Sequence, residues 1–157
     1  MKNLAEKEYL DAQFQLGCYY NIGIGTEVNK SRAFELYKLA AGKGHITAQY
    51  SLSLLYLLGE GIDKDENKAF ELVKNLVNKE YLEAQFQLGY YYDFGIGTEI
   101  NKSKAFELYE LAAGKGYIIA QYNLSLLYQL GEGVDKNEEK AFKLMNNLVK
   151  KEKFLCP

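Results

Sequence analysis

The chain repeats itself every 36 residues, four times in succession. Each copy begins with Ala-Gln, and nine register positions hold the same residue in all four copies. They are Ala12, Gln13, Leu16, Tyr20, Gly23, Gly25, Ala33, Phe34 and Leu36, with equivalents 36, 72 and 108 residues later. A fixed period of this length is typical of chains that stack one supersecondary unit on the next. The sequence therefore predicts four stacked repeats, at residues 12–47, 48–83, 84–119 and 120–155.

A second period of 72 residues lies on top of the first. Copies one and three match at 28 of 36 positions, and copies two and four at 24 of 36. Residues 3–11 resemble residues 75–83, so residues 1–11 are expected to be the tail of a preceding repeat. We expect one helical-repeat domain over residues 1–157, built from unlike neighbours that alternate.

Each repeat is expected to fold as a helical hairpin. Ala12, Leu16 and Tyr20 recur at four-residue spacing, which predicts a first helix over about residues 10–22. Gly23 and Gly25 interrupt it, since glycine accepts backbone conformations that end a helix. The side chain of Asn29, or of Asp65, Asn101 and Asn137 in later copies, is expected to cap the second helix. That helix is expected to end at Gly42 or Gly44. The fold class is therefore all-α, a stack of helix-turn-helix units.

Composition excludes several classes of function. Nineteen basic and 21 acidic residues give a net charge of −2, which leaves no positive excess to bind nucleic acid. The most apolar stretch, residues 50–58, is less than half of a membrane span. The first residues lack the apolar core of a secretory signal, and two cysteines cannot form a disulfide framework. We expect a cytoplasmic protein without a membrane or nucleic-acid partner.

Two segments resemble a known family. Residues 12–25, AQFQLGCYYNIGIG, and residues 32–41, RAFELYKLAA, are similar to the Sel-one-like repeat, a relative of the tetratricopeptide repeat. The resemblance recurs in register in every copy. It implies a right-handed α-solenoid and the role of an adaptor that gathers other proteins. The chain departs from the family at Leu36 and its equivalents, where an aromatic is usual, and at Ser53 and Ser125, where glycine is usual.

In tetratricopeptide-like stacks the first helix of each repeat lines the groove, and the matching positions name a candidate site for a protein or peptide. An aromatic ladder beside an amide and hydroxyl ladder suits an extended peptide. The candidate groove residues are Phe14, Gln15, Tyr50, Ser51, Phe86, Gln87, Tyr122 and Asn123. The alternative is that the rings belong to the core between repeats. Positions 18 and 22 are also apolar in every copy; we expect most of this surface to be buried, and any exposed remainder to mark a binding or self-association patch.

Catalysis, cofactors and metals have no support in the sequence. Every strongly repeated position is accounted for by packing, turns or caps, and the unrepeated polar residues, such as His45, Asp93 and Glu110, show no triad or ligand spacing. The leading hypothesis is a non-catalytic interaction scaffold. A homo-associating module, joined through its uncapped ends and through Phe154 and Leu155, is the alternative. A recruiting segment of a larger signalling protein also stays open, and an enzyme is the weakest hypothesis.

Overall fold

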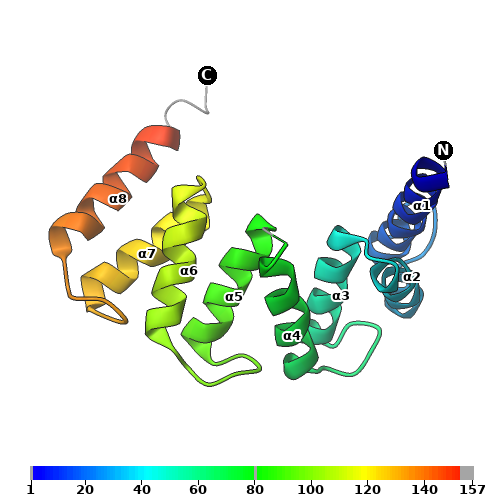
Figure 1. The fold of residues 1–157 in the computed structure, drawn as a ribbon, viewed down its shortest axis with the longest axis horizontal. Coiled ribbons are helices and arrows are strands. Elements are labelled where there is room, and N and C mark those ends of the chain that lie inside the picture. Colours follow the sequence, from blue (N-terminus) through cyan, green and yellow to red (C-terminus); the bar gives the residue numbers. More distant parts are fainter. Residues whose placement is uncertain (1, 80, 153–157) are drawn as a thin grey trace. The chain divides into compact units, whose positions relative to one another are not determined.

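The computed structural model describes residues 2–79 and 81–152, which form eight α-helices with no strand among them (Figure 1). The helices are α1 (Lys2–Ile22), α2 (Lys30–Gly42), α3 (Ile46–Leu58), α4 (Glu66–Val77), α5 (Leu82–Phe94), α6 (Lys102–Gly114), α7 (Ile118–Leu130) and α8 (Glu138–Glu152). The all-α class is confirmed. The predicted end of the fourth repeat, with Phe154 and Leu155, lies outside the described residues.

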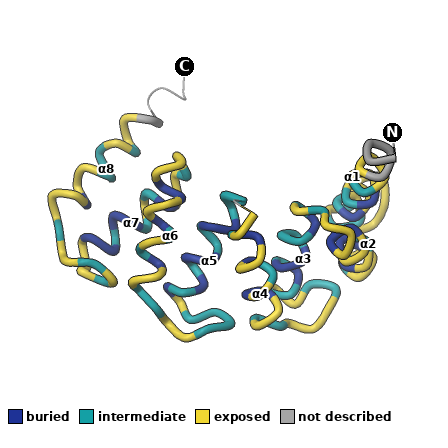
Figure 2. Tube along the Cα trace, viewed as in Figure 1, coloured by how far each residue is buried: buried dark blue, intermediate teal, exposed yellow. Residues whose placement is uncertain are grey.

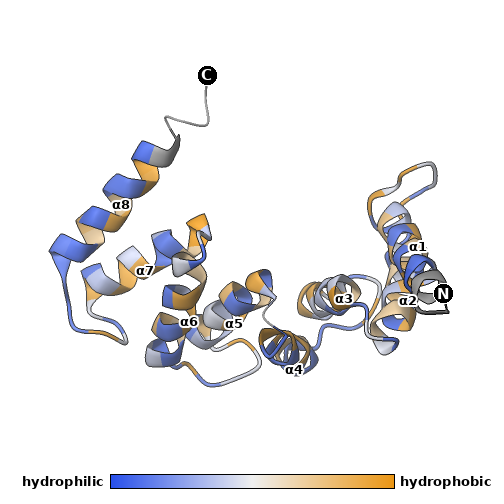
Figure 3. Ribbon diagram, turned by 45° about the horizontal axis from the view of Figure 1, so that its top comes forward, coloured by the Kyte–Doolittle hydropathy of each residue, from blue (hydrophilic) through white to orange (hydrophobic). Residues whose placement is uncertain are grey.

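The helices fall into two compact units. Unit 1 covers Met1–Leu76 and holds the hairpins α1–α2 and α3–α4, whereas unit 2 covers Val77–Pro157 and holds α5–α6 and α7–α8 (Figure 1). Each unit is therefore one odd copy followed by one even copy. Hydrophobic and hydrophilic residues lie side by side along the helices, as expected where a helix buries only one face (Figure 3).

The predicted caps and turns are present in all four repeats. The side chains of Asn29, Asp65, Asn101 and Asn137 accept hydrogen bonds of 2.9–3.0 Å from the backbone three residues on. Gly23 and Gly25, like their equivalents, have positive φ, and so does Gly44, two residues after the last residue of α2. Three of the four first helices span the expected positions 10–22.

Helix α1 is the exception, because it begins at Lys2 and not near residue 10. The nearly equivalent residues 75–83 are split between the end of α4 and the start of α5. Where α4 ends with Val77 and Asn78 follows, the first copy has Ala5 and Glu6. Alanine and glutamate favour a helix more than valine and asparagine do, so residues 2–11 continue as helix.

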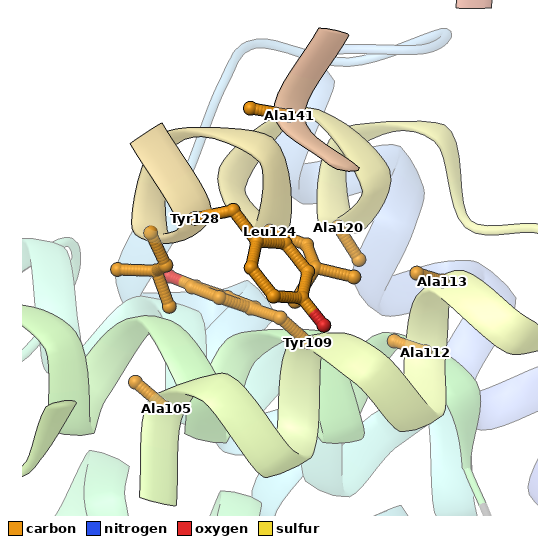
Figure 4. Packing of buried hydrophobic residues seen from close by; sticks show 9 residues of the cluster. Ala105, Tyr109, Ala112, Ala113, Ala120, Leu124, Tyr128 and Ala141 are labelled. Carbon is orange, nitrogen blue, oxygen red and sulfur yellow. The ribbon is translucent and has the colours of Figure 1, made fainter. Parts of the chain in front are cut away.

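Each unit has its own apolar core between the hairpins (Figure 2). In unit 2, Tyr109 of α6 is fully buried, and Figure 4 shows it with Leu124 and Tyr128 of α7, their side chains pointing toward one another. In unit 1, Tyr37 has the equivalent place beside Leu52. The small residues Ala40 and Ala112, also fully buried, let the second helix approach the next hairpin closely.

Size matching explains the alternation of odd and even copies. A Cβ added at Gly17 would lie 2.7 Å from the Tyr37 ring, and one at Gly89 would lie 2.9 Å from the Tyr109 ring. Even copies replace the tyrosine by Val73 or Met145 and the glycine by a serine. The glycine at position 17 therefore makes room for the tyrosine at position 37.

Candidate functional site

The first helix of each hairpin keeps one face free. Positions 12, 16 and 19 of the later copies are buried, whereas positions 11, 15, 18 and 22 are exposed or half-buried in every copy. These four positions follow a spacing of three or four residues and therefore share one side of the helix. We call this side the free face. Its residues are Asp11, Gln15, Cys18 and Ile22 on α1; Thr47, Ser51, Leu54 and Leu58 on α3; Glu83, Gln87, Tyr90 and Phe94 on α5; and Ile119, Asn123, Leu126 and Leu130 on α7.

The predicted groove residues at position 15 lie on the free face. Gln15 is exposed, and Ser51, Gln87 and Asn123 are half-buried. Asn123 is also bound internally, because its side chain hydrogen-bonds to the Tyr109 hydroxyl. Of the four, the odd-copy glutamines Gln15 and Gln87 are the best suited to meet a ligand.

The aromatic ladder at position 14 is divided between packing and exposure. The Phe14 ring stacks on His45 with centroids 4.8 Å apart and lies 5.5 Å from Tyr37. Phe86 lies 5.0 Å from Tyr117 and 5.7 Å from Tyr109 in the same way. In the even copies Tyr50 is half-buried, and Tyr122 is 46% exposed. In odd copies these rings therefore give much of their surface to neighbouring rings.

Position 22 is where the expectation of burial is wrong. Ile22, Leu58, Phe94 and Leu130 are 63%, 61%, 57% and 63% exposed. They stand at the last turn of each first helix, and in unit 2 the Lys102 ammonium at the start of α6 lies 5.8 Å from the centre of the Phe94 ring. In unit 2, rings extend the apolar stripe back along α5, since Tyr90 lies 4.5 Å from Phe94 and 6.5 Å from Phe86. With the exception of Ile119, the free face thus changes from polar at positions 11 and 15 to apolar at positions 18 and 22.

A buried polar network borders the free face of unit 2. Asp93, only 7% exposed, accepts hydrogen bonds from the Lys102 ammonium at 2.6 Å and from the Tyr109 hydroxyl at 3.1 Å. Lys102 also pairs with Glu132 of the next linker at 2.8 Å. The network connects α5, α6 and the α7–α8 linker. Sequence reasoning missed it because its members lie far apart in sequence, although Lys and Glu recur at the same positions in unit 1.

Unit 1 has a weaker version of the network. Lys30 bonds to the neutral Asn21 at 3.0 Å and pairs with Glu60 at 2.8 Å, and the Tyr37 hydroxyl donates to Cys18 Sγ at 3.5 Å. Burial raises the pKa of both tyrosines above the ordinary value of 10.0. For Tyr109 the negative charge of Asp93 raises the pKa further. Both hydroxyls are therefore neutral hydrogen-bonding groups at neutral pH.

In the described part of the chain, no group of three or more histidine, cysteine, aspartate or glutamate side chains is placed to hold a metal ion. None of the helices in residues 2–79 and 81–152 combines the length and the apolar character needed to cross a membrane.

The chain matches the model of a known protein family. A family model of the Sel1 repeat matches residues 10–45, 46–74, 82–117 and 118–146, which is most of the chain. The chain belongs to the Sel1 repeat family. Its four helical hairpins are thus the repeats of an all-α solenoid, as the resemblance implied. Sel1 repeats generally act as protein–protein interaction modules on a scaffold that is typically non-catalytic.

Two solved Sel1-type structures are similar to this chain. A Sel1 repeat protein from Oxalobacter formigenes is 31% identical, with a TM-score of 0.82 over 92% of this chain and 60% of the other. A protective antigen of uropathogenic Escherichia coli strains, which displays this fold, is 29% identical, with a TM-score of 0.84 over 96% of this chain and 32% of the other. This Sel1 chain therefore spans less than two thirds of either relative. None of the curated proteins matches it.

Proposed function

We propose that this Sel1 repeat protein is a non-catalytic scaffold that binds a peptide or protein along the free faces of its first helices. The observation that supports the proposal is the exposed apolar side chain at position 22 in all four repeats. Within each unit, exposed apolar residues that are repeated in register offer a ligand two matching contacts, whereas single exposed ones are ordinary. Of the remaining groove candidates, Ser51 belongs to the free face, whereas Tyr50 and Tyr122 occupy the neighbouring position 14.

Amides at position 15 supply the polar part of the proposed contact. Gln15 and Gln87 can donate and accept hydrogen bonds with the backbone of a bound chain, and neither has a hydrogen-bonding partner within the described residues. The apolar contacts at position 22 then supply most of the buried area, and the amides at position 15 fix the register of the bound chain. This division of labour is common where an extended or helical segment is bound.

The test begins with a pull-down that identifies a partner, followed by affinity measurements on the purified pair. The double variant Gln15→Ala/Gln87→Ala is expected to weaken binding by about thirtyfold, because each of the two lost hydrogen bonds contributes about 1 kcal/mol. The melting temperature is expected to stay unchanged. Asn123 is left intact because its bond to Tyr109 would mix binding with stability.

The matched control is Asn75→Ala/Asn147→Ala, which removes two exposed amides from the second helices α4 and α8. It is expected to leave the affinity unchanged. An equal loss in both double variants would contradict the assignment to the free face. So would a lower melting temperature with unchanged binding in the glutamine variant.

Self-association is a second candidate function, favoured by apolar residues at both ends of the described chain. Leu16 is 45% exposed, whereas Leu52 is 7% exposed, and Phe142 is 70% exposed, whereas Phe34 is 3% exposed. Phe142 also lines a cavity of about 310 Å³ with Ser125 and Met145. Light scattering over a concentration series is expected to show a rising mass, and Phe142→Ser to abolish the rise. A constant monomer mass would remove this candidate.

A further inference from the structure

The linker between the two helices of each hairpin carries an exposed carboxylate at the same position. Glu27, Asp63, Glu99 and Asp135 occupy position 27 in the four copies, and all four are exposed. Within the described residues none of them forms an ion pair. Because all four side chains are exposed, burial in a core does not account for a negative charge that recurs at this position.

The carboxylates lie at the same edge of the hairpin as the apolar residues of position 22. Each linker folds back on the first helix, because the backbone N–H of position 29 donates to the carbonyl of position 20 at 2.8–2.9 Å. In unit 2 the fold is tight enough that a Cβ on Gly95 would lie 2.9 Å from Ile100. Position 27 therefore lies in a closed loop that starts at position 22. The linkers are drawn mainly as exposed or half-buried in Figure 2.

Lysines near this edge do not neutralise the four carboxylates. Lys30 pairs with Glu60, Lys64 with Glu66, Lys102 with Glu132, and Lys136 with Glu138, each at 2.7–2.8 Å. The free face itself has no lysine or arginine at any of its 16 positions. Each unit therefore presents two apolar side chains and two uncompensated negative charges: Ile22 and Leu58 with Glu27 and Asp63, and Phe94 and Leu130 with Glu99 and Asp135.

From this pairing we infer that the partner is a basic amphipathic segment of another protein, with large apolar residues and lysines or arginines on adjacent positions. The inference rests on the proposed function and adds the chemistry of the ligand. Apolar residues of the segment cover position 22, and its cations lie against the carboxylates of position 27. Charge complementarity of this kind raises the association rate and selects among partners. The same carboxylates repel nucleic acids and acidic peptides.

The direct test uses two labelled synthetic peptides and the full chain. One is a helical peptide of about 18 residues with leucine on one face and lysine on the other, and its twin has glutamate in place of lysine. Fluorescence anisotropy is expected to show saturable binding of the lysine peptide and none of the glutamate peptide. Raising the salt from about 50 to about 300 mM is expected to weaken binding several-fold, because exposed charges are screened.

Matched pairs of variants locate the binding. Leu58→Ser/Leu130→Ser is expected to weaken binding of the lysine peptide at least tenfold. The control Leu39→Ser/Leu111→Ser removes leucines that are 47% and 46% exposed on α2 and α6, and it is expected to change nothing. Glu27→Gln/Glu99→Gln is expected to weaken binding about fivefold. Glu35→Gln/Glu107→Gln, which gives the same net charge on the second helices, is expected to leave binding unchanged.

The outcomes separate this inference from the proposed function. Equal binding of both peptides, binding of neither, or equal effects of test and control variants would overturn the inference of a basic ligand. The proposed function would still stand if a partner from the pull-down bound through Gln15 and Gln87. It fails separately if that partner is insensitive to every free-face variant.

Discussion

Gly61→Ala is expected to lower the free energy of unfolding by about 3 kcal/mol or more. A Cβ at Gly61 would overlap the carbonyl group of Lys30 and lie 2.6 Å from the backbone nitrogen of Ser31. Both neighbours are backbone atoms at the start of α2, so neither can rotate away. The φ angle of +75° adds the strain that any residue with a Cβ has there.

Gly25→Ala is the control, since it has the same register position and lies in the same unit. Gly25 has φ +68°, but no atom lies within 4 Å of a Cβ added there. Only the conformational cost remains, and we expect a loss of about 1 kcal/mol. Urea denaturation with an unchanged slope measures both losses. Equal losses would contradict the close approach of the second linker to α2, because the two glycines would then differ in nothing but sequence position.

The difference between Gly25 and Gly61 shows what the repeat pattern can and cannot predict. Periodicity identified the hairpins, the turns and the four caps, because these depend on residues within one repeat. It gave the two glycines the same role. Their difference arises because Gly61 follows an odd copy in the same unit and rests on its second helix, and a period does not contain that contact.

The alternation of position 17 follows the alternation of position 37. Glycine occurs there whenever position 37 is tyrosine, and serine occurs there whenever position 37 is valine or methionine. A Cβ added at Gly17 would lie 2.7 Å from the Tyr37 ring, so these two residues are in contact and the glycine cannot change while the tyrosine stays. The 36-residue period alone does not reveal this tertiary contact between positions 17 and 37.

The candidate site was harder to predict than the fold. An apolar residue at position 22 of every copy indicates contact with something, but the sequence does not tell whether a neighbouring helix or a ligand makes that contact. The four exposed fractions near 60% show that no neighbouring helix covers these side chains. Position 14 is the reverse case. Phe14 and Phe86 are aromatic, as residues of a peptide-binding surface often are, but in the structure they pack on the rings of His45 and Tyr117.

Polar networks escape sequence analysis for a related reason. Asp93 replaces Asn21, a change between similar residues in a pattern dominated by apolar repeats. Its consequence depends on Lys102, Tyr109 and Glu132, which reach it from three other segments. A single negative charge thus turns the loosely bonded arrangement of unit 1 into a partly buried ion pair, in which Asp93 accepts from two donors.

Asp93→Ala is accordingly expected to lower the free energy of unfolding by about 2–3 kcal/mol, because bonds from buried donors to a charged acceptor are costly to lose. Lys102 keeps Glu132, so the loss is smaller than for a charge left without any partner. Asp93→Asn restores the residue of unit 1 and an oxygen acceptor, and it is expected to lower the free energy of unfolding by about half as much.

The matched variant Asn21→Ala is expected to lower the free energy of unfolding by less than about 1 kcal/mol, since it removes one neutral acceptor of Lys30. If Asp93→Ala and Asn21→Ala were equally destabilising, the carboxylate would add nothing to the network. An absorbance titration of the tyrosines gives an independent measurement: without the Asp93 charge, the raised pKa of Tyr109 is expected to fall, and the late part of the titration, where Tyr109 deprotonates, to shift to lower pH.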